Sequence, residues 1–218
     1  MLKVNSSQRD KYAAARNNMV TVQIVDRGVT NQAVLAAMRK VPRHLFVPEE
    51  YIKKAYDDNP LPIGYGQTIS QPYIVAYMTE AVQPTSRKKA LEIGTGSGYQ
   101  AAILAEIVKN VYTIEIIPEL ASEAADRLGK LGYKNVKAKF GDGYKGWPEY
   151  GPFDIIIVTA AAEQIPQPLI DQLAENGRLV MPVGQPSAIQ ELVLIEKKRG
   201  KIEKRRLIFV RFVPFKRL

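Results

Sequence analysis

A glycine-rich turn is the first place in the sequence where residue types and spacing indicate chemistry. Residues 91–99 read L-E-I-G-T-G-S-G-Y, so glycine recurs at every second position, as Gly94, Gly96 and Gly98. Glycines let a ligand approach the backbone, and the start of a following helix offers unpaired N–H groups. The dinucleotide fingerprint is G-x-G-x-x-G, so the third glycine comes one place early here. The turn therefore fits a ligand other than NAD, with a plain strand-to-helix turn as the alternative.

Two acidic residues follow at the ends of the next two predicted strands. Glu115 ends the strand 111–115, at the distance from the glycine turn where an acid accepts hydrogen bonds from ribose hydroxyls. Asp142 follows the strand 136–140 between two glycines, where it can accept a hydrogen bond from an adenine amino group. An Asp-Gly turn alone would explain that second motif. The register of all these positions favours a nucleoside-containing cofactor.

Few other groups are available for acid–base or covalent catalysis. The chain has no cysteine, which excludes thiol nucleophiles, disulfides and Cys-ligated zinc. We interpret the single histidine, His44, as structural. Asp154 starts a predicted strand, and we assign it a role in the turn before that strand or in packing. Ser70 is not in a G-x-S-x-G elbow, which argues against an activated serine nucleophile. Three neighbouring aromatic residues allow two interpretations: Tyr144, Trp147 and Tyr150. They could line a pocket, but we favour a role as core or surface residues.

The positive charge of the chain is concentrated at its C-terminal end. The 218 residues include 31 Lys and Arg against 22 Asp and Glu, a net charge of +9. Residues 196–218 hold ten Lys and Arg against two Glu, or +8, which leaves +1 for residues 1–195. A high pI is typical of nucleic-acid-binding proteins, but the body of this chain is nearly neutral. No apolar run approaches the roughly 18 residues of a membrane span and no secretory signal is visible, so we expect a cytoplasmic protein.

The elements that must position these motifs follow an alternating pattern. Strand-like runs at 90–93, 111–115, 136–140, 154–158 and 178–183 alternate with helical segments at 99–108, 118–131 and 166–174. Gly177 is placed as the C-cap of the last helix. This alternation predicts an α/β fold with an open, doubly wound, Rossmann-like sheet that is mostly parallel. Beyond it, the basic tail predicts two antiparallel strands around a turn at residues 199–200.

Two helices and a long loop precede the sheet. The first helix is expected to end at Gly28. Its residues Tyr12, Ala15, Met19 and Val22 recur at three- and four-residue spacing and should lie on one face. A second helix, capped by Thr30 or Asn31, ends at Pro42 and turns these side chains inward: Val34, Leu35, Met38 and Val41. Residues 57–72 are rich in Pro and Gly and predict a long ordered loop of the kind that often carries function. A short helix with Ile74, Val75 and Met78 follows.

Together these motifs resemble the class I S-adenosylmethionine-dependent methyltransferases. The resemblance rests on E-I-G-T-G-S-G-Y, then Y-T-I-E, then G-D-G. The upstream segment 62–73, P-I-G-Y-G-Q-T-I-S-Q-P-Y, is similar to the signature of the protein-L-isoaspartate(D-aspartate) O-methyltransferase family. Further matches to that family lie at 41–47, 152–161, 179–184 and 211–214. The resemblance runs from about residue 20 to the end, and T-I-S followed by Pro72 is its most specific part.

The resemblance implies a site shared between a cofactor and a substrate. Ser70 corresponds to the family's active-site serine, with Thr68 beside it, and these two are the candidate catalytic residues. The positions implied to bind S-adenosyl-L-methionine are Gln67, Thr68, Ile69, Ser70, Glu92, Gly94, Thr95, Gly96, Ser97, Gly98, Glu115, Ile116, Gly141, Asp142, Gly143 and Thr159. The glycine turn would line the methionine part, Glu115 would hold the ribose, and Asp142 with Gly143 the adenine. Tyr73 stands where many members carry His, and no metal is expected.

The implied reaction is methyl transfer to the free carboxylate of L-isoaspartyl, and of D-aspartyl, residues in damaged proteins and peptides. The products would be S-adenosyl-L-homocysteine and a methyl ester, which collapses to a succinimide whose hydrolysis returns some normal aspartate. The carboxylate is ionised at pH 7 and is itself the nucleophile, so His, Cys and metal are dispensable. We expect isoaspartyl proteins and peptides as partners, no nucleic acid, no membrane and a monomer.

Two alternatives and a domain plan complete the sequence predictions. A nucleic-acid methyltransferase would use the basic tail, but the chain lacks an N/D-P-P-Y/F motif and a cysteine for attack on cytosine. A non-catalytic module of the same fold is disfavoured by the intact cofactor positions. We expect one methyltransferase domain over 1–218, with N-terminal helices and the active-site loop in 1–88. The cofactor-binding core would occupy 89–184 and antiparallel strands 185–218.

Overall fold

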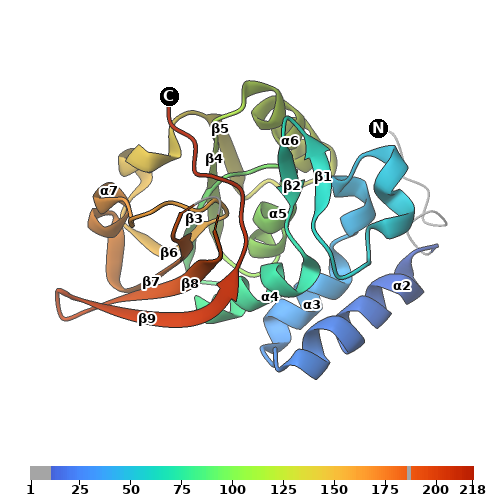
Figure 1. The fold of residues 1–218 in the computed structure, drawn as a ribbon, viewed down its shortest axis with the longest axis horizontal. Helices are drawn as coiled ribbons and strands as arrows, with labels where there is room; N and C mark the ends of the chain where they lie inside the picture. Colours follow the sequence, from blue (N-terminus) through green and yellow to red (C-terminus); the bar gives the residue numbers. More distant parts are fainter. Residues whose placement is uncertain (1–10, 186–187) are drawn as a thin grey trace.

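A seven-stranded mixed sheet lies at the centre of the computed structural model, which describes residues 11–185 and 188–218 (Figure 1). The strands lie in the order β5-β4-β3-β6-β7-β8-β9. Their bounds are Lys89–Ile93 (β3), Asn110–Glu115 (β4), Val136–Phe140 (β5), Phe153–Val158 (β6), Leu173–Val183 (β7), Gln190–Lys198 (β8) and Lys201–Val210 (β9). β3 to β7 pair in parallel, whereas β8 and β9 are antiparallel. The predicted doubly wound sheet with a C-terminal hairpin is confirmed.

Helices cover the sheet and continue into an N-terminal layer. The α-helices are Ala13–Asn18 (α2), Gln32–Lys40 (α3), Pro72–Ala81 (α4), Tyr99–Ala105 (α5), Pro118–Lys130 (α6) and Gln167–Asp171 (α7). Shorter turns are Met19–Ile24 (η1), Val25–Arg27 (η2), Arg43–Phe46 (η3), Glu49–Lys54 (η4), Gly143–Lys145 (η5) and Pro148–Tyr150 (η6). A separate two-stranded hairpin consists of β1, Leu61–Gly64, and β2, Gln67–Ile69.

The central strand β6 explains why the sheet needs helices on both faces. Its residues 155–158 are all apolar and fully buried. Ile155 and Ile157 belong to the core cluster that also contains side chains of α3 to α6. Ile156 and Val158 belong to a second cluster, which includes Leu169 of α7. Successive side chains of a strand point to opposite faces, so an unbroken apolar run requires cover on both.

The first N-terminal helix differs from its prediction. α2 runs directly into the π-helical segment η1, and the buried side chains are Met19, Val20 and Ile24. Ala15 and Val22 are exposed, so the predicted apolar face through these positions is wrong. A π turn holds more residues than an α turn, which rotates the following side chains around the axis. The predicted stop is confirmed, because Gly28 takes a left-handed conformation.

The second helix, α3, matches its prediction, and its N-cap is Asn31 and not Thr30. The side chain of Asn31 accepts hydrogen bonds from the backbone N–H groups of Ala33 and Val34. The four predicted inward residues are all buried. Glu80 of α4 accepts hydrogen bonds from the N–H groups of Thr30 and Asn31, at 2.8 and 2.6 Å. Asn31 therefore caps α3 through its side chain and helps to attach α3 to α4 through its backbone N–H.

Four predictions of local structure were wrong. The helix expected over 166–174 ends at Asp171, and β7 begins at Leu173. Gly177 lies inside β7 and does not cap a helix; a Cβ there would lie 2.7 Å from the carbonyl oxygen of Ala174. The helix expected over 99–108 ends at Ala105. Finally, the expected loop 57–72 contains the β1–β2 hairpin, whose two turn residues, Tyr65 and Gly66, both have the positive φ that a tight hairpin turn requires.

Removal of the Asn31 cap should destabilise the protein. An Asn31→Ala variant leaves two N–H groups of α3 without their acceptor and should lose about 0.5–2 kcal/mol of unfolding free energy. Urea denaturation measures this loss. Thr30→Ala is the matched control at the other predicted cap and should change stability by less than about 0.5 kcal/mol. Equal losses in the two variants would contradict the assignment of the cap.

Candidate active site

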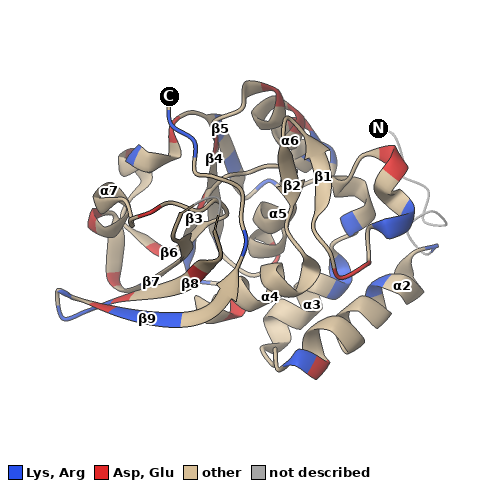
Figure 2. Ribbon diagram, in the orientation of Figure 1, with Lys and Arg blue, Asp and Glu red and all other residues tan. Residues whose placement is uncertain are grey.

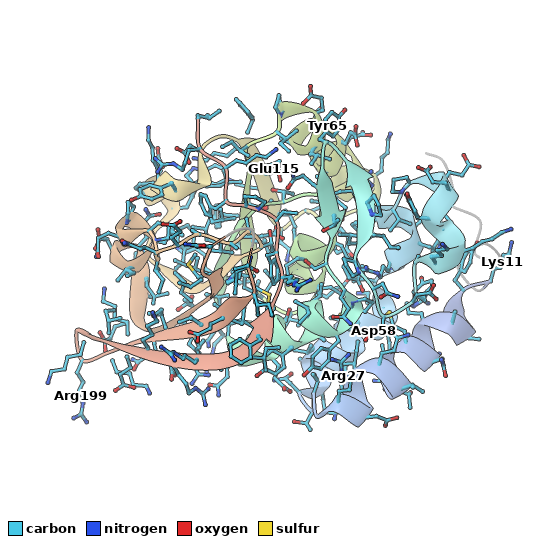
Figure 3. All side chains as sticks on the ribbon, viewed as in Figure 1. Lys11, Arg27, Asp58, Tyr65, Glu115 and Arg199 are labelled. Carbon is cyan, nitrogen blue, oxygen red and sulfur yellow. The ribbon has the colours of Figure 1, made fainter. Side chains whose placement is uncertain are left out.

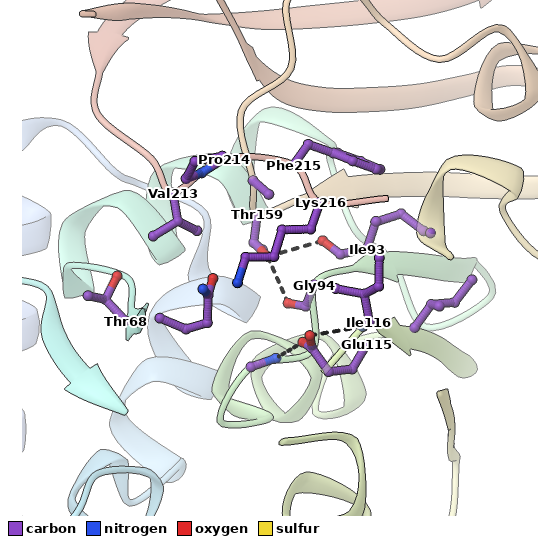
Figure 4. A pocket seen from close by; sticks show the side chains of 15 residues that line it. Thr68, Ile93, Gly94, Glu115, Ile116, Thr159, Val213, Pro214, Phe215 and Lys216 are labelled. Atoms are coloured by element: carbon purple, nitrogen blue, oxygen red, sulfur yellow. Dashed lines mark hydrogen bonds between the residues drawn. The ribbon is translucent and has the colours of Figure 1, made fainter. Parts of the chain in front are cut away.

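The carboxyl ends of β3 and β6 define the place where a ligand can enter. The chain winds from β3 outward to β4 and β5 and then returns to β6 on the other side, so a crevice opens where the two winding directions meet. Gly94 follows β3 and Thr159 follows β6. The Thr159 hydroxyl donates to the carbonyl oxygen of Gly94 at 2.7 Å (Figure 4). A Cβ on Gly94 would lie 2.4 Å from that hydroxyl oxygen, so glycine is required here.

Glu115 closes the glycine turn from the side of β4. Its Oε2 accepts a hydrogen bond from the N–H of Gly96 at 2.7 Å, and its Oε1 accepts from Ile116 and Ile117 at 2.9 and 3.0 Å. The side chain is 5 % exposed and lines the cavity at the end of β3. Three backbone donors thus fix the orientation of this carboxylate. Its oxygens keep the capacity to accept further hydrogen bonds from hydroxyl groups.

Asp142 lies at the end of β5 and already has two partners. Its Oδ1 accepts from the N–H of Tyr144 at 3.0 Å, and its Oδ2 pairs with the guanidinium of Arg217 at 2.9 Å. Arg217 also stacks on the Tyr144 ring, 3.6 Å from the ring centroid. Tyr144 therefore lies beside Asp142, whereas Trp147 and Tyr150 pack against the second core cluster. Next to it, Gly143 must be glycine, because a Cβ would lie 2.3 Å from Ile93 Cγ2.

A cavity of about 60 Å³ connects these groups. The predicted cofactor positions that line it are Gln67, Thr68, Gly94, Gly96, Glu115, Ile116, Gly143 and Thr159. A neighbouring cavity of about 30 Å³ shares four of these residues and adds Ile69, Ser70, Glu92, Thr95 and Ser97. Residues 213–216 also line the first cavity, although no cofactor role was predicted for them. Backbone hydrogen bonds from Ala161 to Val213 and from Phe215 to Ala161 hold this segment in place.

Three predicted cofactor positions do not line these cavities. Gly98 is the left-handed residue before α5, and a Cβ there would lie 3.3 Å from Leu128. Gly141 donates its N–H to the carbonyl oxygen of Glu115. Asp142 engages Arg217 as described. Gly98 and Gly141 therefore shape the backbone around the cavity, and Asp142 lies next to Gly143, which does line it.

Glu92 is a fully buried carboxyl group beside the 30 Å³ cavity. Its Oε2 accepts a hydrogen bond from the Thr113 hydroxyl at 2.6 Å, while Oε1 has no partner among the described residues. Burial, with a further contribution from the nearby Glu115, raises the pKa of Glu92 to about 8. An unpaired buried acceptor at a cavity wall suits a ligand that brings a hydrogen-bond donor or a positive charge.

The loop that carries Ser70 is fastened to the N-terminal layer through Asp58. Gln71 donates from Nε2 to both the carbonyl oxygen and Oδ2 of Asp58, each at 2.8 Å. Arg27 pairs with the same Oδ2 at 2.6 Å, and Figure 3 shows the two labelled residues next to each other. Sequence reasoning missed both Arg27 and Asp58. No local signal marks them, because the partners are 31 positions apart in the chain.

A larger cavity of about 540 Å³ opens beside Ser70 and forms a groove. It shares Thr68 and Thr159 with the smaller cavity, so the two spaces meet at these side chains. Tyr73 lines the groove, and its ring packs on the guanidinium of Arg27 at 3.5 Å. Tyr73 therefore presents a cation-packed ring to the groove.

The residues interpreted as structural have structural contacts. His44 Nδ1 lies 2.7 Å from the Tyr56 hydroxyl oxygen, and burial together with Arg16 lowers the pKa of His44 to about 4. The carboxylate of Asp154 accepts from the N–H of Lys89 at the start of β3. Trp147 and Tyr150 pack on the ring of Tyr112. These interpretations agree with the structure.

Over 11–185 and 188–218, no group of three or more His, Cys, Asp or Glu side chains is placed to hold a metal ion. In the same part of the chain, no helix has the length and apolar character needed to cross a membrane.

Comparisons with known proteins agree with this geometry. The family model for protein-L-isoaspartate(D-aspartate) O-methyltransferase matches residues 14–217. A protein-L-isoaspartate O-methyltransferase of Gloeobacter violaceus is 59% identical over 91% of this chain and 97% of its own. A solved structure of a protein-L-isoaspartate O-methyltransferase aligns with a TM-score of 0.84 and 29% identity, over 91% of this chain and 65% of that longer chain.

A second solved structure contains a ligand. It is a Plasmodium falciparum protein-L-isoaspartate O-methyltransferase in complex with S-adenosyl-L-homocysteine. It aligns with a TM-score of 0.79 and 28% identity, over 92% of this chain and 98% of that chain. The chain belongs to the protein-L-isoaspartate(D-aspartate) O-methyltransferase family.

Proposed function

We propose that the protein transfers a methyl group from S-adenosyl-L-methionine to the free carboxylate of L-isoaspartyl and D-aspartyl residues in damaged proteins and peptides. One observation carries the assignment: the cavity at the glycine turn and the groove beside Ser70 meet at Thr68 and Thr159. A methyl donor on one side of this junction and a peptide on the other would have their reacting groups adjacent. The family and the S-adenosyl-L-homocysteine complex of a relative support the same reaction.

The chain's residues fit the cofactor that the family implies. Glu115, which three backbone donors orient, would hold the ribose hydroxyls, and Asp142 with Gly143 would hold the adenine. The unpaired Oε1 of Glu92 and the glycine turn suit the methionine part. When bound, S-adenosyl-L-methionine supplies an activated methyl group on a positively charged sulfur.

On the substrate side, the chain needs to orient one carboxylate. That group is ionised at neutral pH, so no general base has to remove a proton from it. The hydroxyl groups of Thr68 and Ser70 are the donors at the groove wall that can hold its oxygens. Asp58 keeps Ser70 in register through Gln71. Correct alignment of two reactants can lower a barrier by as much as roughly 7–11 kcal/mol, so positioning can account for much of the catalysis.

Three further sequence predictions stay predictions: cytoplasmic location, a monomeric state and the absence of a nucleic-acid substrate. The division of the chain into a helical and loop region (1–88), a core (89–184) and a C-terminal hairpin region (185–218) likewise stays a proposal.

A Ser70→Ala variant should lose turnover more than cofactor affinity. Ser70 lines the groove, so loss of its hydroxyl would remove a donor to the substrate carboxylate and leave Glu115 and Asp142 in place. We expect kcat for an isoaspartyl peptide to fall about tenfold or more, the equivalent of about 1.4 kcal/mol. Binding of S-adenosyl-L-methionine, measured by calorimetry, should change less than threefold.

The exposed Ser86→Ala change provides the matched control for this experiment and should leave both quantities unchanged. Equal losses of turnover and cofactor affinity in Ser70→Ala would instead make the loop a cofactor clamp.

An Asp142→Ala variant should bind S-adenosyl-L-methionine about ten- to a hundredfold more weakly. Loss of a hydrogen bond to a charged acceptor costs about 1.5–3 kcal/mol. Calorimetric titration measures the change. Arg217→Gln is the control, because it removes the partner of Asp142 but keeps the carboxylate. Its affinity should stay the same or increase, and unchanged affinity in Asp142→Ala would refute the adenine assignment.

Glu92 should make the free protein less stable as the pH rises. Its pKa is raised from 4.5 to about 8 in the folded state, so the folded chain keeps a proton that the unfolded chain releases between these values. The unfolding free energy should therefore fall across this window. Urea denaturation of Glu92→Gln at pH 5 and pH 8 should show a smaller fall than the unmodified protein. Identical pH dependence in the two proteins would mean that Glu92 titrates normally.

A further inference from the structure

One asparagine of the chain is followed by glycine, and the fold leaves it on the surface. Asn176-Gly177 is the only Asn-Gly pair in the sequence, and it lies inside β7, where Asn176 is exposed. Residues 174–177 lie opposite the single residue Asp154 of β6, and the pairing of β7 with β8 begins only at Arg178. The segment 174–177 is therefore a bulge in which the regular pairing of the sheet is interrupted.

The backbone of this bulge accounts for both residues of the pair. Asn176 has a φ of 61°, in the left-handed region that asparagine and glycine tolerate better than other residues. A Cβ on Gly177 would lie 2.7 Å from the carbonyl oxygen of Ala174 and 3.1 Å from its nitrogen, so glycine is required there. The geometry of β7 thus favours an asparagine that is followed by a glycine.

An Asn-Gly pair is chemically labile because glycine leaves its backbone nitrogen unshielded and the main chain free to bend. The nitrogen of Gly177 loses its proton and attacks the side-chain carbonyl carbon of Asn176. A new bond joins these two atoms, the bond to the amide nitrogen breaks, and ammonia leaves, which gives a five-membered succinimide. Water then opens the ring at either carbonyl, so the products are an isoaspartyl and an aspartyl residue.

The side chain of Asn176 is free for this reaction. It makes no hydrogen bond with another described residue. In contrast, Asn31 accepts two hydrogen bonds as the cap of α3, and Asn135 donates to two backbone carbonyl oxygens. The related Asp-Gly pair at Asp142 is restrained, because its carboxylate is paired with Arg217. Asn176 is therefore the least restrained of these positions.

We propose that Asn176 is a site of spontaneous deamidation in the folded protein, and that its isoaspartyl product loosens the anchor of the β8–β9 hairpin. The neighbouring Glu175 accepts hydrogen bonds from the N–H groups of Arg199 and Gly200, at the turn of this hairpin. Figure 2 shows basic residues at the same tip. An isoaspartyl link adds a methylene group to the main chain directly after Glu175 and so displaces its carboxylate from the turn. The reaction consumes only water and is independent of the methyl transfer proposed above.

Digestion with trypsin tests the site directly. The fragment 146–178 contains Asn176 as its only asparagine, and the fragment 28–39 contains only Asn31. After the native protein has been kept in mildly alkaline buffer, mass spectrometry should show an amide converted to a carboxyl at residue 176. This conversion should be about tenfold or more faster than at Asn31, because glycine restricts the main chain least. Comparison with synthetic peptides separates the isoaspartyl product from the aspartyl one.

Two results of this experiment would overturn the proposal. One is a rate at Asn176 no higher than at Asn31 in the native protein. The other is conversion that occurs only after the protein has been unfolded in urea, which would mean that the bulge protects the pair.

Hydrogen exchange tests the effect on the hairpin. In protein aged until most of Asn176 is converted, the N–H groups of Arg199 and Gly200 should exchange about three- to tenfold faster than in fresh protein, the equivalent of one lost hydrogen bond. Asn176→Gly keeps the positive φ but has no side-chain amide, so its aged and fresh samples should exchange alike. Asn176→Asp adds the charge without the extra methylene group and should exchange like the fresh protein.

Three outcomes would contradict the role of the isoaspartyl link. They are unchanged exchange in the aged unmodified protein, equal acceleration in aged Asn176→Gly, and an acceleration of the same size in fresh Asn176→Asp.

Discussion

The contact between the carboxyl ends of β3 and β6 is the constraint on which the rest of the site depends. Thr159 bonds to the carbonyl oxygen of Gly94 across the point where the winding of the sheet reverses. The close approach leaves no room for a Cβ on Gly94, and it places the Thr159 side chain in the wall of both main cavities. A cofactor cavity and a substrate groove that share a wall are the geometry that group transfer requires.

Two layers of the protein supply the two sides of this junction. The sheet provides Glu115 and the glycine turn, which depend on parallel strand ends. The substrate side comes from the N-terminal layer, where Asp58 links Arg27 to the residue after Ser70. The segment 213–216 then packs over the cofactor cavity through its hydrogen bonds with Ala161. Segments far apart in the chain therefore meet at one place, and each is held by its own local contacts.

Local patterns allowed much of the core and of the cofactor side to be predicted. The strand at 136–140 has the expected bounds, and the glycine turn lies between β3 and α5, because apolar periodicity and glycine act within a few residues. The face of the first helix was wrong because a π turn leaves no clear signal in side-chain spacing. Gly177 was misplaced because a glycine inside a strand resembles a helix end in sequence. Asp58 and the C-terminal cover depend on long-range contacts, which a single sequence does not reveal.

The net charge of +9 first indicated nucleic acid, yet the cofactor positions and Ser70 all lie in the nearly neutral body of the chain. The most direct test of the methyl-transfer account uses labelled S-adenosyl-L-methionine with three acceptors: an isoaspartyl peptide, its normal aspartyl twin and a mixture of RNA and DNA. The account predicts base-labile label on the isoaspartyl peptide alone. Label on nucleic acid with none on the isoaspartyl peptide would contradict it.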